Sequence, residues 1–358
     1  MTDIYVKTPG KLFVAGEYAV VEKGYSAVIT AVDTFIHLTI KETEKNYGLV
    51  FSKGFTVEPA KWSRSRNRFW LKKQNYRLKY IRSAIHTTER YLYEQRIPLR
   101  LFDLEISSEL NTEKGKKLGL GSSGAITVGT VRALLQFYGL EDEDELVYKL
   151  SVIAQMNLGD SSSFGDLAAS CYTGWIKYTN FDHKFVTHRL RRMPTKRLVE
   201  LDWPSLKIER LTVSDEINFL IGWTGSPASS NRLVRDVQTQ KKQSHREYRH
   251  FLNESKKSVD QLAEALSTND TEGIKEAVAR NRMALLEMGQ QTGVMIETPA
   301  LEKLIELAAK DNAVAKTSGA GGGDSGIAFV FDESNRSNLI ADWENAGIRH
   351  LPIKTYQK

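Results

Sequence analysis

The sequence contains a single cysteine, Cys171, among its 358 residues. One cysteine excludes an internal disulfide bond and a cysteine-based metal site, which is typical of a protein in a reducing cytoplasm. No apolar run approaches the roughly 20 residues that cross a bilayer, and the polar N-terminus lacks the basic start and hydrophobic stretch of a signal peptide. We therefore expect a soluble, cytoplasmic protein that does not insert into membranes. Cys171 lies in the apolar run 167–172, which favours a buried small hydrophobic residue over a nucleophile.

Internal repeats and low-complexity tracts are also absent, so the chain is expected to fold into ordinary globular domains. A length of 358 residues is too great for one ordinary core, and a hydrophobic content of 41% can supply two. We expect two domains of mixed α and β structure that share a cleft, over residues 1–188 and 189–358.

Hydrophobic periodicity predicts strands and helices in both halves of the chain. The expected strands cover residues 4–6, 12–15, 27–31, 34–40, 101–106, 219–223, 327–331 and 348–353. The expected helices cover residues 80–93, 126–138, 231–266, 272–292 and 335–346. A polar, basic stretch over residues 189–207 separates the two halves.

The segment 115–125 reads Gly-Lys-Lys-Leu-Gly-Leu-Gly-Ser-Ser-Gly-Ala and leads into an apolar helical pattern. The first turn of that helix, Ser122 to Gly124, would direct unpaired N–H groups and the positive end of the helix dipole at an anion. Gly119 and Gly121 allow positive φ and close backbone approach. Two lysines, Lys116 and Lys117, add charge. The segment therefore predicts a phosphate-binding loop.

A glycine-rich turn that only caps a helix is the alternative interpretation of this segment, since a lone glycine motif is weak evidence. The spacing excludes two well-known phosphate loops. In a Walker loop the lysine follows the last glycine, and in a dinucleotide-binding loop the glycines open a βαβ unit. Here the lysines precede the glycines.

Two further segments have compositions that predict special local structure. In residues 4–17, two short apolar strands flank a turn at Pro9 and Gly10, which would hold Lys11 at the start of the second strand with its ammonium group in a cleft. An exposed hairpin lysine is the alternative.

Residues 316–326 read Lys-Thr-Ser-Gly-Ala-Gly-Gly-Gly-Asp-Ser-Gly, and five glycines between two strands indicate a backbone that bends tightly around something.

Together these three segments resemble the motifs of the GHMP kinases, in order and spacing along the whole chain. The first family motif is Pro-Gly-Lys followed by a strand and Gly-Glu, the second is Gly-Leu-Gly-Ser-Ser, and the third is a C-terminal glycine-rich loop. Within the family, the segments are most similar to the bacterial phosphomevalonate kinases. Mevalonate kinases usually carry histidine after Gly-Glu, where this chain has Tyr18. The segment 159–174 also resembles the phosphomevalonate kinase version of the catalytic aspartate loop, with Asp166 at the aspartate position.

This resemblance implies an S5-like N-terminal domain, a ferredoxin-like C-terminal domain and an active site between them. It also implies ATP-dependent phosphorylation of 5-phosphomevalonate to 5-diphosphomevalonate, in the mevalonate pathway of isoprenoid biosynthesis. Phosphorylation of mevalonate is the alternative within the family, and homoserine and sugar kinase activities are further ones. Oligomeric state stays open.

The resemblance assigns roles in phosphoryl transfer, where positioning and charge neutralisation supply most of the acceleration. Lys11 would stabilise the transferring phosphoryl group, Lys117 would add charge, and the Ser123 hydroxyl would bind Mg²⁺. Backbone N–H groups of the loop would hold the ATP phosphates, at Gly119, Leu120, Gly121, Ser122, Ser123 and Gly124. Mevalonate kinases carry a metal-binding glutamate about three helical turns before the aspartate. Gln155 stands there in this chain, which leaves ATP oxygens and water to complete the coordination shell.

Asp166 needs a separate argument, because in kinases that act on alcohols this aspartate is commonly described as the base. A phosphomonoester has a second pKa of about 6, so its attacking oxygen is already largely anionic at pH 7. We therefore expect Asp166 to orient Lys11 and the acceptor rather than to remove a proton. The alternative is an N-cap for a helix that starts at Leu167.

An acceptor with a carboxylate and a phosphate calls for cations and hydroxyl donors. The resemblance suggests Tyr18, Lys116, Ser163, Ser229, Ser230, Ser318 and Gly321 as substrate-binding residues. For the serines, helix capping or loop hydrogen bonding is the alternative. The adenine pocket is expected between the region of Pro59 and Asn111, without further assignment.

Nucleic-acid binding is the alternative from a different class of function. Residues 59–88 hold nine lysines or arginines and no acid, interleaved with aromatic residues, and the net charge is +6 with a pI near 9.1. The aromatic residues are Trp62, Phe69, Trp70, Tyr76 and Tyr80. A solvated helix face with an aromatic stripe in the core explains the pattern better, and attraction of small anions comes second.

Overall fold

The computed structural model describes residues 3–53, 58–65, 68–71, 78–111, 118–225, 230–240, 245–323 and 325–358. Within them, the strands of the larger sheet are β1 (Ile4–Ala15), β2 (Ser26–Glu42), β3 (Gly48–Ser52), β4 (Ala60–Ser65), β5 (Arg68–Leu71), β6 (Phe102–Ser108), β7 (Trp175–Thr179) and β8 (Lys207–Leu211). Their order is β5-β4-β3-β6-β2-β7-β8, and β1 pairs with β2. The pairs are antiparallel except for β3 with β6, so the sheet is mixed.

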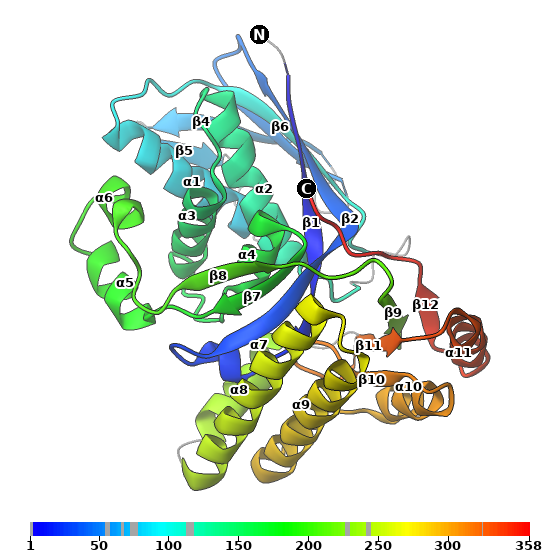
Figure 1. The fold of residues 1–358 in the computed structure, drawn as a ribbon. Helices are drawn as coiled ribbons and strands as arrows, with labels where there is room; N and C mark the ends of the chain where they lie inside the picture. Colours follow the sequence, from blue (N-terminus) through cyan, green and yellow to red (C-terminus); the bar gives the residue numbers. More distant parts are fainter. Residues whose placement is uncertain are drawn as a thin grey trace.

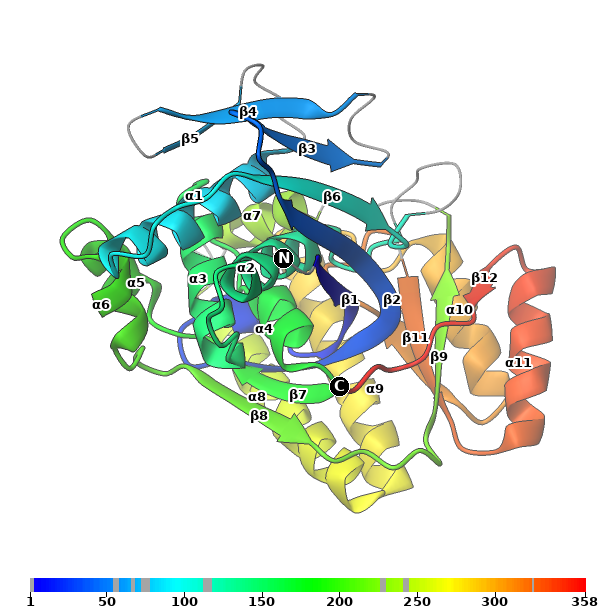
Figure 2. The same ribbon diagram turned by 90° about the horizontal axis from the view of Figure 1, so that it is seen from above.

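Two helices, α2 (Ser122–Phe137) and α4 (Gly165–Tyr172), pack against β1 and β2 of this sheet. Helices α1 (Lys79–Glu94) and α3 (Asp144–Met156) pack against α2 in turn, and α1 also contacts β5, an arrangement that can be followed in Figures 1 and 2. A short 3-10 helix, η1 (Ala19–Val21), follows β1. Helix α2 lies at the centre and is buried from Gly124 to Leu135. Its small residues let neighbouring elements approach closely. Two further helices, α5 (His183–Leu190) and α6 (Thr195–Glu200), follow β7, and α6 lies wholly within the polar, basic stretch 189–207.

The smaller sheet has the order β10-β11-β9-β12, formed by β9 (Asn218–Trp223), β10 (Val314–Thr317), β11 (Ser325–Val330) and β12 (Arg349–Leu351). Its helices are α7 (Ser230–Gln240), α8 (His245–Thr268), α9 (Thr271–Thr292), α10 (Pro299–Lys310) and α11 (Glu333–Asn345). All of its strand pairs are antiparallel, and the chain order β9, helices, β10, β11, α11, β12 is that of a ferredoxin-like unit. The expected ferredoxin-like C-terminal domain is therefore present.

The division at residues 188 and 189 stays a prediction. Strand β8 pairs with β7, so the larger sheet itself extends to Leu211. Residues 354–358 then return to the larger sheet, where the Tyr356 N–H donates to the Ala31 carbonyl at 2.9 Å and the Tyr356 carbonyl accepts from the Gly174 N–H at 2.6 Å. Figure 1 shows this return beside β1 and β2.

The expected turn at Pro9 and Gly10 is wrong. Strand β1 continues through both residues, and its register with β2 shifts between them. Among the described strands β1 pairs with β2 alone, so a proline without an N–H donor is tolerated on its other side. Strand β2 likewise continues through the gap expected at residues 32–33.

Candidate active site

The loop before α2 brings Lys11 under the first turn of that helix. Gly119 and Gly121 both have positive φ, at 78° and 79°, and Gly121 is the N-cap of α2, which begins at Ser122 as expected. The Lys11 N–H donates to the Leu120 carbonyl at 2.9 Å, and the Lys11 ammonium lies 3.4 Å from the Gly119 carbonyl oxygen. A Cβ atom at Gly121 would lie 2.8 Å from Lys11 Cε. Glycine is therefore required by both φ and close approach.

Asp166 faces the same turn from α4. A Cβ atom at Gly124 would lie 2.5 Å from Asp166 Oδ2, so the carboxylate packs directly on the α2 backbone. Burial raises the pKa of Asp166 above its usual range, while the positive charge of Lys11 and backbone hydrogen bonds act in the opposite direction. Lys11 and Asp166, predicted from separate motifs, thus lie together at the N-terminal end of α2.

Phe164, and not Asp166, is the N-cap residue of α4, which begins at Gly165. The N-cap interpretation of Asp166 is therefore wrong. Phe164 has φ of 57°, an uncommon value for a bulky residue, and its fully buried ring stacks on Phe181 with centroids 5.8 Å apart. Packing around the ring holds the strained backbone that carries Asp166.

Gln155 on α3 lies beside the first turns of α2. Its amide donates to Thr127 Oγ1 at 3.1 Å and to the Ser123 carbonyl at 3.4 Å. In the part of the chain that the structure describes, no three histidine, cysteine or acidic side chains gather as a metal site. Ser123 belongs to the first turn of α2 and Asp166 lies against Gly124 of the same turn, and hydroxyl and carboxylate oxygens are the donor types that suit a hard cation such as Mg²⁺.

The third glycine-rich segment is joined to the first motif by a buried ion pair. Lys316 Nζ lies 2.5 Å from Glu17 Oε1, and both side chains are at most 2% exposed. The same Glu17 oxygen accepts from the Gly319 N–H at 3.3 Å. The Tyr18 hydroxyl donates to the Ala320 carbonyl at 2.5 Å, and burial raises the pKa of this phenol, so it stays protonated as a donor. These bonds hold the C-terminal loop against the end of β1.

Replacement of Lys316 by methionine should destabilise the protein by roughly 3–5 kcal/mol, because a buried Glu17 carboxylate would lose its countercharge. The double variant Lys316→Met, Glu17→Gln should be closer to the parent, since no uncompensated charge remains. Urea unfolding measures both free energies. Equal losses in the single and double variants would contradict the charge argument.

The predicted substrate-binding residues have several different environments. Ser163 is buried, its hydroxyl accepts from the Gly165 N–H at 3.4 Å, and its carbonyl accepts from the Tyr178 hydroxyl at 2.7 Å. The Ser318 hydroxyl donates to the Phe13 carbonyl at 2.7 Å, and Gly321 lies against the Ile296 carbonyl. Tyr18, Ser163 and Ser318 therefore all make internal hydrogen bonds. Lys116, Lys117 and Ser229 lie outside the described residues, and Ser230 begins α7 with a side chain that the structure does not describe.

A cavity of about 360 Å³ opens between β5, α1 and the end of α3. Phe69, Trp70, Ser83, His86 and Leu158 are among its lining residues, and the Trp70 side chain is exposed. Leu158 lies three residues after Gln155, whose amide donates to Ser123 and Thr127 of α2. Apart from Asn157 and Leu158, the lining residues fall within the region expected to hold adenine.

The basic aromatic segment does not present all of its rings to solvent. Trp62 and Phe69 are buried and pack on each other with ring centroids 4.7 Å apart, and Arg64 pairs with Glu89 at 2.6 Å. These rings belong to the core and are not available for base stacking. Tyr76 lies outside the described residues.

Comparison with family models gives two matches in this chain. The model for the GHMP kinases N terminal domain matches residues 79–174, and the model for the GHMP kinases C terminal matches residues 262–349. The chain belongs to the GHMP kinase family. The GHMP kinase fold that the three motifs imply is therefore confirmed.

Relatives within the GHMP kinase family cover the chain almost completely. A phosphomevalonate kinase of Streptomyces sp. (strain CL190) is 35% identical over 96% of this chain and 95% of its own length. The structure of Streptococcus pneumoniae phosphomevalonate kinase in complex with phosphomevalonate and AMPPNP has a TM-score of 0.87 and 32% identity, and covers 99% of this chain and 100% of its own. The Methanococcus jannaschii mevalonate kinase structure shares the fold, with a TM-score of 0.71, 22% identity, and 99% of each chain covered.

Sequence reasoning missed residues that hold the segments of this candidate site in place. Glu17 lies in the segment 4–17 and Lys316 in the segment 316–326, but neither motif indicates that the two side chains form an ion pair. Tyr178 of β7 donates a hydrogen bond to the Ser163 carbonyl, and this tyrosine lies in none of the motifs.

Among the helices that the structure describes, none combines the length and the apolar composition that a membrane-spanning helix needs.

Proposed function

We propose that this GHMP kinase transfers the γ-phosphoryl group of ATP to the phosphate of 5-phosphomevalonate, giving 5-diphosphomevalonate and ADP. The observation that carries the proposal is the full-length similarity to phosphomevalonate kinases, above all to the one solved with phosphomevalonate and AMPPNP. The meeting of Lys11, Asp166 and the α2 turn supports it, because in-line phosphoryl transfer needs a cation and anion-binding N–H groups at one point.

In this mechanism the backbone N–H groups from Gly119 to Gly124 hold the nucleotide phosphates. Lys11 neutralises charge on the transferring group, and Asp166 keeps the Lys11 ammonium and the acceptor in line. The Ser123 hydroxyl would bind Mg²⁺, which supplies further charge neutralisation on the phosphate oxygens when bound. Lys117 would contribute an additional charge.

The acceptor is proposed to lie between the Asp166 loop and the C-terminal glycine-rich segment. Ser163, Ser318 and Gly321 border that region, and Tyr18 closes it through its bond to Ala320. Lys116, Ser229 and Ser230 complete the proposed set. The internal hydrogen bonds of Ser163, Ser318 and Tyr18 favour backbone groups of these loops as direct contacts.

The test is ADP release by the purified protein with Mg²⁺ and ATP, with 5-phosphomevalonate, mevalonate, homoserine and galactose compared at equal concentrations. Strong preference for 5-phosphomevalonate is expected. Preference for mevalonate would mean that the acceptor pocket favours a hydroxyl, and turnover of none of the four would overturn the proposal.

The role of Asp166 can be tested by pH dependence. With Asp166→Asn, kcat should fall less than with removal of the Lys11 charge, because the acceptor phosphate needs no base. The acid limb of kcat/KM, set near pH 6 by the second ionisation of the acceptor, should persist. Burial raises the pKa of Asp166, so in the parent enzyme ionisation of this carboxylate is lost as pH falls through that raised value. A loss equal to that of the Lys11 variant, together with disappearance of an acid limb, would identify Asp166 as a base.

We also propose that the cavity beside Trp70 receives the adenine base. Trp70→Ala should raise KM for ATP by about tenfold and leave kcat unchanged, since stacking on an aromatic ring contributes about 1–3 kcal/mol per base. Tyr93→Ala, at another exposed ring on α1, is the control. An unchanged KM for ATP would place the base elsewhere.

A further inference from the structure

Helices α2 and α4 lie side by side with their N-terminal ends at the candidate active site. At that end Gly124 of α2 meets Asp166 of α4. At the other end, Arg132 of α2 donates to the Cys171 carbonyl in the last turn of α4 at 3.2 Å. The two helices therefore run parallel and are joined at both ends.

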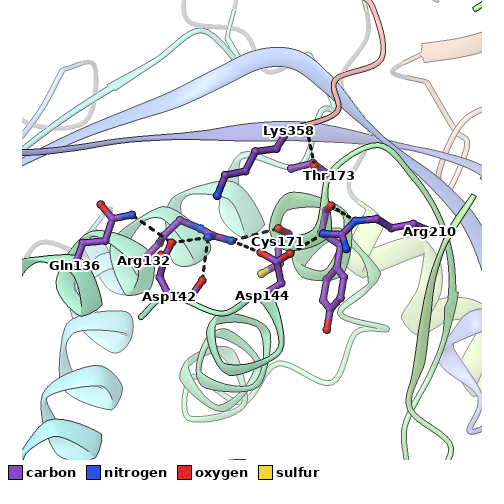
Figure 3. A network of polar contacts seen from close by, with 9 residues as sticks. Arg132, Gln136, Asp142, Asp144, Cys171, Thr173, Arg210 and Lys358 are labelled. Atoms are coloured by element: carbon purple, nitrogen blue, oxygen red, sulfur yellow. Dashed lines mark hydrogen bonds and ion pairs between the residues drawn. The ribbon is translucent and has the colours of Figure 1, made fainter. Parts of the chain in front are cut away.

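Arg132 is buried, and its guanidinium group forms ion pairs as well as the hydrogen bond to the end of α4. Its side chain is 9% exposed, and it pairs with Asp142 at 2.5 Å and with Asp144 at 2.9 Å. Figure 3 shows the guanidinium group between these two carboxylates and the Cys171 carbonyl. A buried arginine held in this way has little freedom to move, so it can fix the distance between the helices.

A second arginine reaches the same helix end from β8. Arg210 donates to the Tyr172 carbonyl at 3.1 Å and to Asp144 Oδ2 at 2.7 Å. Asp144 thus uses one oxygen for each arginine, as Figure 3 shows. The two cations lie at the negative end of the α4 dipole, where they are stabilising.

A separate bond joins α4 to the strand that carries Lys11. The Ser170 hydroxyl donates to the Pro9 carbonyl at 2.9 Å, two residues before Lys11. Because α4 spans only eight residues, a shift at its C-terminal end must also move Asp166 in its first turn.

We propose that Arg132, Asp144 and Arg210 are positioning residues for Asp166, acting through α4 without touching substrate. This inference rests on the proposed function, because it assigns these residues to the phosphoryl-transfer step at the same site. An error of about 1 Å at a reacting group can lower a rate by as much as 10²-fold. Loss of the contacts that these residues make at the C-terminal end of α4 is therefore expected to lower kcat measurably.

The test uses Asp144→Asn, which keeps the shape of the side chain but turns an NH₂ group toward one of the arginines. We expect kcat to fall about tenfold, with KM for ATP within twofold of the parent, because the loop 119–124 stays intact. Arg210→Gln should cause a smaller fall, since Arg132 still holds Cys171. Glu333→Gln, which breaks an exposed pair with Arg336 on α11, is the matched control and should change neither constant.

A double-mutant cycle separates positioning from general loosening of the fold. In the Asp166→Asn background, Asp144→Asn should lower kcat by less than twofold, because the group it positions is already removed. The same tenfold fall in both backgrounds, or no fall in the parent, would overturn the proposal.

Hydrogen exchange of the α4 amides supplies a readout that needs no acceptor. Asp144→Asn should speed exchange over residues 165–172 while exchange in α11 stays unchanged. Unchanged exchange in α4 would also overturn the proposal. Failure of the parent enzyme to use 5-phosphomevalonate would instead contradict the proposed function. The exchange measurement would still show whether Asp144 holds α4 in place, because it does not depend on the acceptor.

Discussion

Replacement of Lys11 by methionine is expected to lower kcat by about 10²–10³-fold, as removal of one preorganised group that stabilises developing charge typically does. The Lys11 ammonium lies 3.4 Å from the Gly119 carbonyl, and its charge reaches Asp166. Methionine keeps an unbranched stem under Gly121, where a Cβ atom would be only 2.8 Å from Lys11 Cε. The loop should therefore keep its shape, and KM for ATP should change little. Steady-state kinetics with 5-phosphomevalonate measures both constants.

Lys7→Met is the matched control on the same strand. The Lys7 ammonium lies 4.6 Å from the centroid of the Phe35 ring and 5.2 Å from that of Tyr356, so this lysine packs on the returning C-terminal segment. Its replacement should leave kcat within twofold of the parent. If Lys11→Met retained more than a tenth of the parent kcat, a charge at this position would not be essential for transfer.

Local signals predicted the parts of the site that lie within one segment. Glycines and small residues at 119–124 indicated a helix start at Ser122, and the structure has it there. The start of α10 carries an equally clear local signal, since Thr298 caps it and Pro299 follows, but this helix is absent from the elements expected from hydrophobic periodicity. Helix α3, with Asp144 and Glu145 in its first turn, was missed in the same way.

Long-range partners could not be predicted from one sequence. Glu17 and Lys316 are separated by 299 positions, and periodicity shows only that each lies near a strand or loop. Arg132 lies within an apolar helical pattern, where an arginine predicts a solvated face. Its burial depends on Asp142, Asp144 and the end of α4, which no local pattern specifies.

The replacement Gly124→Ala should lower kcat by about 10²-fold without loss of thermal stability. A Cβ atom at this position would lie 2.5 Å from Asp166 Oδ2 and 3.0 Å from its Cγ, so the carboxylate must move away from the α2 turn. Alanine is otherwise the better helix residue, by roughly 0.5–1 kcal/mol. We therefore expect Tm to stay within a few degrees of the parent while activity is lost.

Gly129→Ala adds the same methyl group to the same helix, but we expect it to lower stability and to leave activity unchanged. Its Cβ would contact the Leu38 side chain and lie 2.8 Å from Thr8 Oγ1, both on strands of the larger sheet. Overpacking there costs about 1–3 kcal/mol, so Tm should fall while kcat stays within twofold of the parent.

If Gly124→Ala kept full activity, Asp166 could move without any effect on the reaction. Neither the contact of Asp166 with α2 nor the arginine contacts at the end of α4 would then control kcat. If both variants lost activity and stability together, α2 would act as one structural unit and the separation of site from scaffold would be wrong.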